Sequence, residues 1–162
     1  AARRLLETED TGLTAVAVSG EVWRLRWSQL EALAEGDTEI ARYLHDRLSE
    51  QAARLAMHSA IIGGLTGDER VASLLIELTE RIGTPVAGGI AFDMPLSRAD
   101  VADYLALNAD TVSRIVSRLR AKGVISQSGR SRFICHDKRA LADESPVARA
   151  LKAMHGPGAS AS

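Results

Sequence analysis

Residues 38–62 contain neither proline nor glycine, and this uninterrupted stretch limits the folds open to the chain more than any other segment. Apolar side chains recur along it at steps of three and four residues, the spacing of one face of a long α-helix. A helix of this length spans roughly 37 Å at about 1.5 Å per residue. Its seam consists of Ile40, Leu44, Leu48, Gln51, Leu55, His58 and Ile62. The spacing is close to that of a coiled coil, so the sequence predicts a helix that packs along another helix.

Two kinds of partner could cover this seam. The helix could pack on its own chain, and the sequence leaves that alternative open. The segment that precedes it, residues 1–35, is small beside so long a helix, so pairing with a second copy of the chain explains the pattern better. We therefore expect a homodimer with this seam as its interface, in which Gln51 and His58 are polar interruptions that fix the register of the two helices.

The segment before the long helix has the pattern of short β-strands. Residues 14–18 and 22–27 favour strands, and the Ser-Gly pair at 19–20 fits a turn between them. Ser28 is expected to cap a short helix that ends at Leu33. Two or three strands cannot bury a sheet alone, so this segment is expected to pack on something else or to be the remnant of a larger domain.

A capped helix and a loop follow the long helix. The glycines at residues 63–64 end the long helix and supply a hinge. Thr66 and Glu69 have the spacing of a capping box, which opens a helix to about Ile82. The other segments are predicted as a loop or hairpin at 83–96 and a frayed tail at 145–162.

Residues 97–123 have the pattern of two short helices joined by a tight turn. Ser97 and Asp100 form a second capping box. The helical pattern breaks at Leu107, and Asn108 is a good N-cap for a second helix that ends at Gly123. The apolar stripe of this second helix is Val112, Ile115, Val116 and Leu119, at i, i+3, i+4 and i+7. The arrangement predicts a helix-turn-helix.

The opposite stripe of the second helix carries short polar side chains and an arginine near the helix N-terminus. Its members are Asp110, Ser113, Arg114 and Ser117. Small side chains allow a helix to enter a major groove about 12 Å wide, and an arginine can donate two hydrogen bonds to guanine. The pattern favours a helix that reads DNA bases through Asp110, Ser113 and Arg114. A solvated face on an ordinary helical hairpin is the alternative that the pattern leaves open.

A hairpin is predicted directly after the second helix. Residues 124–126 and 132–135 have strand patterns, and 128–131 has the pattern of a turn. With the two helices this hairpin makes a winged helix-turn-helix that reaches Cys135, which we expect to be a packed apolar residue. The side chains expected to contact DNA phosphates are Ser97, Arg98, Asn108, Thr111, Ser117, Arg118, Ser128 and Arg130.

The distribution of charge favours a polyanionic partner. Residues 1–96 carry 9 basic and 15 acidic side chains, whereas residues 97–140 carry 9 basic and 4 acidic ones. The formal net charge of the whole chain is −1, so a basic segment stands on an acidic body. Such a contrast is typical of a surface that attracts nucleic acid.

Composition argues against several other classes of protein. Aromatic residues make up 4% of the chain, too few for a platform on which single-stranded nucleic acid stacks. One cysteine and four histidines without ligand spacing predict no metal site and no cofactor. No nucleophile, base and orienting group converge, so we expect no enzymatic activity. No apolar run reaches the length of a membrane span, and we expect a cytoplasmic protein.

The order of segments and three motifs resemble the cyclic-AMP-receptor/fumarate-nitrate-regulator (Crp/Fnr) transcription regulators. The motifs are Leu96-Ser-Arg-Ala-Asp-Val-Ala-Asp-Tyr-Leu105, Asp110-Thr-Val-Ser-Arg114 and Gly123-Val-Ile125. The resemblance covers about residues 11–140. It implies a bacterial, nucleoid-associated homodimer that binds a near-palindromic site on double-stranded DNA and contacts RNA polymerase.

The resemblance is to the Fnr/FixK-like branch, whose base-reading motif is Glu-x-x-Ser-Arg. Ser113 and Arg114 match this motif directly, whereas Asp110 is one methylene shorter than the glutamate. Ala106 stands where the family has a glycine in the turn. Cyclic AMP is disfavoured as an effector, because Leu55 and Ala56 occupy the positions that would contact its base and cannot make those hydrogen bonds.

The resemblance also implies a domain organisation for a mainly α chain with small β portions. The domains are a remnant of a cyclic-nucleotide-binding-type β-roll at 1–36, a dimerisation helix at 37–62, a winged helix-turn-helix DNA-binding domain at 63–140 and a C-terminal tail at 141–162. Most of the family's sensor β-roll is absent, and we expect residues to be missing at or near Asp10–Thr11.

A winged helix can also dock a partner protein. The near-neutral net charge permits a protein-interaction module without sequence-specific DNA binding, which is the alternative to a DNA-binding regulator. Salt-sensitive and sequence-dependent binding to duplex DNA distinguishes the two functions.

Overall fold

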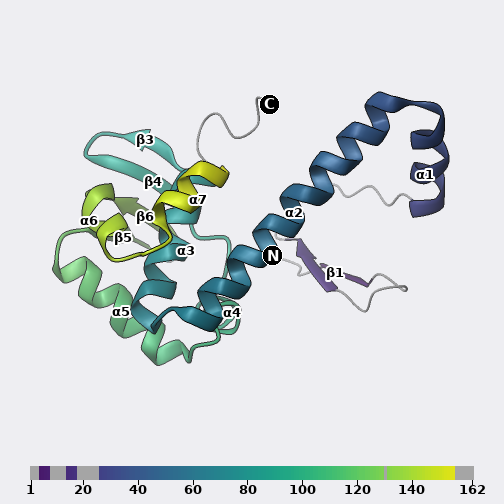
Figure 1. Cartoon of the computed structure of the whole chain (residues 1–162). Helices are drawn as coiled ribbons and strands as arrows, with labels where there is room; N and C mark the ends of the chain where they lie inside the picture. The colour runs from purple at the N-terminus through teal and green to yellow at the C-terminus, as the bar shows by residue number, and fades with distance from the viewer. Residues whose placement is uncertain (1–3, 8–13, 18–25, 130, 156–162) are drawn as a thin grey trace. The chain divides into compact units, whose positions relative to one another are not determined.

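The computed structural model describes residues 4–7, 14–17, 26–129 and 131–155, and it divides the chain into two compact units, 1–54 and 55–162 (Figure 1). The chain is mainly helical with two small antiparallel sheets, which confirms the predicted fold class. The division between the units falls within the long helix α2 (Thr38–Gly64). Within the described ranges no helix is long and apolar enough to cross a membrane.

The N-terminal unit contains a two-stranded sheet and a short helix. β1 (Arg4–Glu7) pairs antiparallel with β2 (Thr14–Ala17). α1 (Trp27–Gly36) begins at the residue where the sequence predicted a strand to end. The indole Nε1 of Trp27 donates a hydrogen bond of 2.6 Å to Glu31 Oε1, one helical turn later, and an extended chain would separate these two groups.

Two predictions for this segment are wrong. Ser28 lies inside the first turn of α1 and does not cap it, because the N-cap position is occupied by Arg26. The helix also continues past Leu33 to Gly36, after which Asp37 adopts an extended conformation. Most of the second predicted strand and the break predicted at Asp10–Thr11 lie outside the described residues.

The long helix predicted from residues 38–62 is present as α2 and ends at Gly64. Asp37 caps it, because its Oδ1 accepts hydrogen bonds of 2.8 and 3.2 Å from the backbone N–H groups of Glu39 and Ile40. Within α2 only Ile61 is fully buried.

A four-stranded antiparallel sheet belongs to the C-terminal unit, with the order β3-β4-β6-β5. Its strands are β3 (Thr84–Val86), β4 (Gly89–Asp93), β5 (Ile125–Ser128) and β6 (Arg132–Cys135). The hairpin predicted within 83–96 is therefore present, and it joins the wing hairpin through β4 and β6. Phe92 lies opposite Phe133 in this pairing, and their rings stack with centroids 5.7 Å apart. The wing thus has a rigid base.

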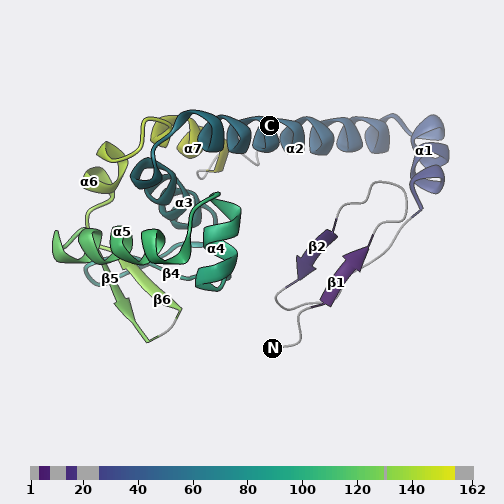
Figure 2. The same ribbon diagram turned by 90° about the horizontal axis from the view of Figure 1, so that it is seen from below.

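α3 (Gly67–Ile82) packs against the sheet and the helices around it, and supplies much of the core (Figure 2). Its predicted capping box is present: Thr66 Oγ1 accepts from Glu69 N–H, and the Glu69 carboxylate accepts from Thr66 N–H over 2.8 Å. These hydrogen bonds hold the pKa of Glu69 below its ordinary value. Fully buried side chains of the core include Val71, Leu75, Phe92, Leu105, Ile125, Leu141 and Leu151.

The predicted helix-turn-helix consists of α4 (Arg98–Tyr104) and α5 (Ala109–Ala121). In the turn between them, Leu107 N–H donates a hydrogen bond of 2.8 Å to Ala102 C=O. Ala106 has φ +50°, and among the described residues it is the one non-glycine residue with a positive φ. Gly123, with φ +70°, ends α5 in the left-handed conformation that glycine favours.

The C-terminal segment is ordered, so the prediction of a frayed tail from residue 145 is wrong for residues up to His155. α6 (Lys138–Asp143) spans the predicted boundary at 140/141, and α7 (Ala148–His155) packs against α3. Leu151 is buried, and the buried hydroxyls of Ser145 and Ser73 share a hydrogen bond of 2.8 Å. The last seven residues, 156–162, lie outside the described part.

Candidate nucleic-acid interface

The orientation of α5 is fixed by its buried stripe. Val112, Ile115 and Leu119 are buried against the core, and Val116 is partly buried beside them. Each fully buried aliphatic side chain contributes about 1.5–3 kcal/mol, so rotation of the helix about its axis is costly. The opposite, polar stripe therefore faces away from the core.

The three side chains predicted to read bases lie on this polar stripe. Asp110 and Arg114 are exposed and Ser113 is half-buried. Arg114 Nη2 donates a hydrogen bond of 3.1 Å to Thr111 Oγ1, which holds the guanidinium along the first turns of α5. The structure thus brings the three residues together on one helix face, while their contacts with bases remain a prediction.

Two of the predicted phosphate contacts also cap helices. Asn108 Oδ1 accepts a hydrogen bond of 2.7 Å from Thr111 N–H at the start of α5. Ser97 Oγ donates to Asp100 Oδ2 over 2.6 Å at the start of α4. The Ser97 hydroxyl proton is thereby engaged, so a phosphate would have to displace Asp100 to receive it. Arg98 and Ser117 are exposed and need no such rearrangement.

Arg118, another predicted phosphate contact, forms an ion pair with Asp68 in the first turn of α3. Both side chains are about half exposed, at 53% and 49%. An exposed pair of this kind contributes about 0–1 kcal/mol, so it can exchange for a phosphate. Asp68 is nevertheless a competitor for Arg118 that sequence reasoning missed, since the two residues are far apart in the chain.

The wing presents polar side chains at its open end. Ser128 is exposed at the end of β5, whereas Arg130 lies outside the described residues. Arg132, at the start of β6, pairs with Asp93 of β4 over 2.8 Å. Cys135, at the end of β6, is buried as predicted, and burial raises the pKa of its thiol.

The middle of the predicted dimer seam is exposed in the single chain, whereas Ile40 and Leu44 near its start are half-buried. Leu48 and Leu55 are 50% and 61% exposed, and Gln51 is exposed as well. His58 and Ile62, at the C-terminal end of the seam, are half-buried within their own unit, where His58 stacks on Tyr104. The middle of the seam therefore exposes apolar side chains that a partner could bury.

The described residues give no candidate metal site on this surface. No group of three or more His, Cys, Asp or Glu side chains able to hold a metal occurs in the described part of the chain. Leu55 and Ala56 are exposed on α2 and carry no hydrogen-bonding group in their side chains. The expectations about metals and cyclic AMP stay predictions.

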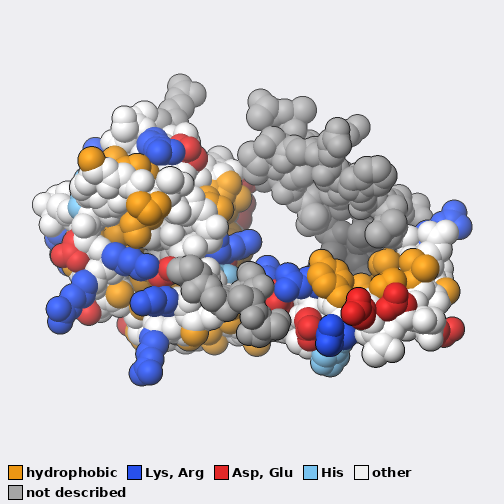
Figure 3. All heavy atoms as spheres, turned by 90° about the horizontal axis from the view of Figure 1, so that it is seen from above, with side chains coloured by type: hydrophobic (Ala, Val, Ile, Leu, Met, Phe, Trp, Pro, Cys, Tyr) orange, Lys and Arg blue, Asp and Glu red, His pale blue; other side chains and the backbone are white. Residues whose placement is uncertain are grey.

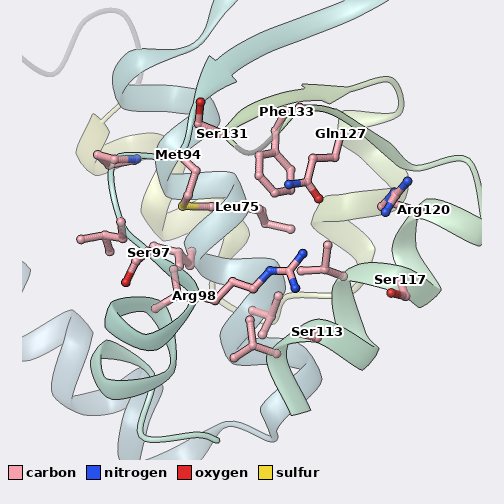
Figure 4. A pocket seen from close by; sticks show the side chains of 18 residues that line it. Leu75, Met94, Ser97, Arg98, Ser113, Ser117, Arg120, Gln127, Ser131 and Phe133 are labelled. Atoms are coloured by element: carbon pink, nitrogen blue, oxygen red, sulfur yellow. The ribbon is translucent and has the colours of Figure 1, made fainter. Parts of the chain in front are cut away.

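Arg120 is a further basic residue that the sequence reasoning did not select. It follows Ser113 by seven residues and Ser117 by three on α5, a spacing that places the three on one helix face. All three line a pocket between α4, α5 and the wing (Figure 4). Lysine and arginine side chains also project at several points from the visible face of the C-terminal unit in Figure 3.

The fold and this surface define a winged helix-turn-helix domain, a class in which the second helix carries the polar, arginine-bearing face. Residues 69–144 match the family of Crp-like helix-turn-helix domains. Residues 69–144 therefore form a Crp-like helix-turn-helix domain, and the chain is similar to regulators of the Fnr and FixK type. The predicted resemblance is thereby confirmed.

Known proteins similar to this chain include regulators of the same type. It is 35% identical over 117 residues to a probable transcriptional activator of Rhizobium leguminosarum bv. viciae, covering 72% of this chain and 49% of that protein. It is 35% identical over 119 residues to the nitrogen fixation regulation protein FixK of Azorhizobium caulinodans, covering 73% and 48%. The structure of FixK2 from Bradyrhizobium japonicum matches with a TM-score of 0.67 and 33% identity, covering 73% of this chain and 58% of that one. The chain spans about half the length of the curated relatives it matches.

Proposed function

We propose that this chain acts in a sequence-specific regulator of transcription that binds a near-palindromic site on double-stranded DNA as a homodimer. The observation that carries the proposal is the polar stripe of α5, which presents Asp110, Ser113 and Arg114 on the face opposite the buried one. A helix of this kind fits a major groove, and its arginine can bind guanine through two hydrogen bonds. The names of the relatives, which describe transcriptional activation and regulation of nitrogen fixation, support the role in transcription.

The homodimer is supported by the exposed seam of α2. Two copies paired along Leu48 and Leu55 would bury these leucines and set two recognition helices in successive major grooves, about 34 Å apart. We expect Leu55→Glu to shift the chain toward the monomer in sedimentation velocity. Arg42→Glu, an exposed position of α2 outside the seam, is the control and should leave the mass unchanged.

Selection of bound sites from random DNA duplexes tests the function. A regulator of this class enriches one near-palindromic motif whose half-sites are spaced by one turn of DNA. Enrichment of no motif, together with salt-independent binding, would favour the alternative of a protein-interaction module. Contact with RNA polymerase and association with the nucleoid in the cytoplasm belong to this proposal, and cross-linking of the chain to polymerase on the selected site tests the former.

A further inference from the structure

A pocket lies beside the recognition helix, on the side that faces the wing. It has a volume of about 630 Å³ and is bounded by α3, α4, α5 and the β5–β6 hairpin (Figure 4). Pockets that hold small ligands commonly measure about 300–1,000 Å³, so the volume suits a small organic molecule. Every element that bounds it belongs to the C-terminal unit.

The floor of the pocket is apolar. Val71, Leu74 and Leu75 reach it from α3, Val112 from α5 and Phe133 from β6. Phe133 is the one aromatic side chain among the described residues that line the pocket, so these residues offer no pair of rings to hold a flat ligand. An aliphatic chain placed on this apolar floor removes apolar surface from water, which favours an aliphatic ligand.

The rim of the pocket is polar and positively charged. Arg98 and Arg120 line it, and no acidic side chain occurs among the described residues of the lining. In Figure 4 the Arg98 side chain extends from α4 toward α5, and Arg120 lies beside Gln127 on the side away from Met94. Neither guanidinium makes an ion pair within the described ranges, so the pocket attracts an anion. A guanidinium binds a carboxylate through two parallel hydrogen bonds.

We propose that this pocket binds a medium-chain aliphatic carboxylate, with the chain on the floor formed by α3 and Phe133 and the carboxylate at the arginines of the rim. Ser97, Arg98, Ser113 and Ser117 line the same pocket and are also predicted DNA contacts. The carboxylate and DNA therefore compete for this face, and the competition rests on the proposed function.

Isothermal titration of the full chain with octanoate tests the binding directly, without DNA. We expect saturable binding of one octanoate per chain. Octanol should bind at least about tenfold more weakly because it lacks the charge that the arginines recognise. Acetate should show no saturable binding because it lacks the aliphatic chain. Absence of saturable octanoate binding, or equal affinities for octanoate and octanol, would overturn the proposal.

Three variants locate the site. Arg120→Gln removes one rim charge at an exposed position outside the predicted DNA contacts, and Val116→Trp fills the pocket from α5. Each should weaken octanoate binding at least about fivefold. Arg149→Gln, an exposed position of α7 outside the lining, is the matched control and should leave the affinity unchanged. Equal effects of Arg120→Gln and Arg149→Gln would contradict the site, and this comparison does not depend on the folding of Val116→Trp.

A second measurement separates this inference from the proposed function. On a selected DNA site, saturating octanoate should lower the DNA affinity of the wild type and have a smaller effect on Arg120→Gln. If the chain enriches no DNA motif, the proposed function is wrong. The calorimetric titration then still tests whether the pocket binds octanoate, because it uses no DNA. If octanoate and DNA bind together with unchanged affinities, the two ligands do not compete for this face.

Discussion

The ring of His58, near the end of α2, stacks on the ring of Tyr104 at the end of α4, with centroids 4.2 Å apart and planes inclined by 30°. The contact joins the last turns of the long helix to the first helix of the helix-turn-helix. Burial, reinforced by the negative charge of Glu77, raises the pKa of Tyr104, so its hydroxyl stays neutral at physiological pH. His58 therefore has a partner within its own chain as well as a place on the predicted dimer seam.

A double-mutant cycle measures this stacking. His58→Ala and Tyr104→Ala should each lower the free energy of unfolding, and the double variant should show a coupling of about 0.5–1.5 kcal/mol, the usual value of an aromatic pair. Urea denaturation at fixed protein concentration provides the free energies. The cycle of His58→Ala with Tyr43→Ala, an exposed tyrosine of α2, is the control. A coupling no larger than that of the control would mean that the stacking adds no stability.

The turn of the helix-turn-helix stores strain at Ala106. A residue with a Cβ pays about 1–2 kcal/mol in the left-handed conformation, whereas glycine adopts it freely. Ala106→Gly should therefore raise the free energy of unfolding, by at most about 1 kcal/mol because glycine also loses more entropy on folding. Differential scanning calorimetry should show a higher Tm.

The control for this substitution is Ala153→Gly in α7, where the residue is exposed and helical. There the same replacement should lower the free energy of unfolding by about 0.5–1 kcal/mol, because the helical conformation gives glycine no advantage. If Ala106→Gly lowered the Tm as much as Ala153→Gly does, the strain at Ala106 would be negligible.

Local patterns predicted much of this fold because they depend on neighbouring residues. The capping boxes at Thr66 and Ser97 and the N-cap at Asn108 are encoded within four residues each, and all three are present. α7 was missed because its ordered position depends on distant partners. Leu151 is the one fully buried residue of that helix, and Ser145 bonds to Ser73 of α3. With eight residues, the helix is also too short for its apolar pattern to predict it from the sequence.

In the candidate site, too, features set by neighbouring residues were predicted and features set by distant contacts were not. Helical periodicity placed Asp110, Ser113 and Arg114 on one face, and the structure confirms that they share it. The ion pair between Arg118 and Asp68 joins α5 to α3, and no local sequence pattern predicts it. The pocket could not be predicted from the sequence either, because its residues come from five elements, α3, α4, α5, β5 and β6, that meet through the tertiary fold.

Asp68 should limit the affinity for DNA by neutralising Arg118. Asp68→Asn releases the guanidinium for a phosphate and removes a negative charge. Binding to all sequences should therefore strengthen alike, by at most about 1 kcal/mol, the upper end of what an exposed pair contributes. Fluorescence anisotropy on selected and random duplexes at several salt concentrations should also show a salt dependence steeper by about one unit.

Asp143→Asn is the matched control, since Asp143 is an exposed acidic residue of α6, outside the α5 surface. It changes the net charge by the same amount, so it should reproduce any effect of overall charge alone. Equal gains from Asp68→Asn and Asp143→Asn would show that Arg118 does not contact phosphate.

Arg114 should distinguish specific from random DNA. It lies two turns or less from the N-terminus of α5, beside Ser113 and held by Thr111, and no acidic side chain pairs with it within the described residues. Arg114→Ala should cost about 1–3 kcal/mol on the selected site and far less on random duplex, because it removes a base contact. Anisotropy titrations of both duplexes measure the difference, with Arg149→Ala as a control for lost charge. Equal losses on the two duplexes would assign Arg114 to the phosphate backbone and leave base reading to Asp110 and Ser113.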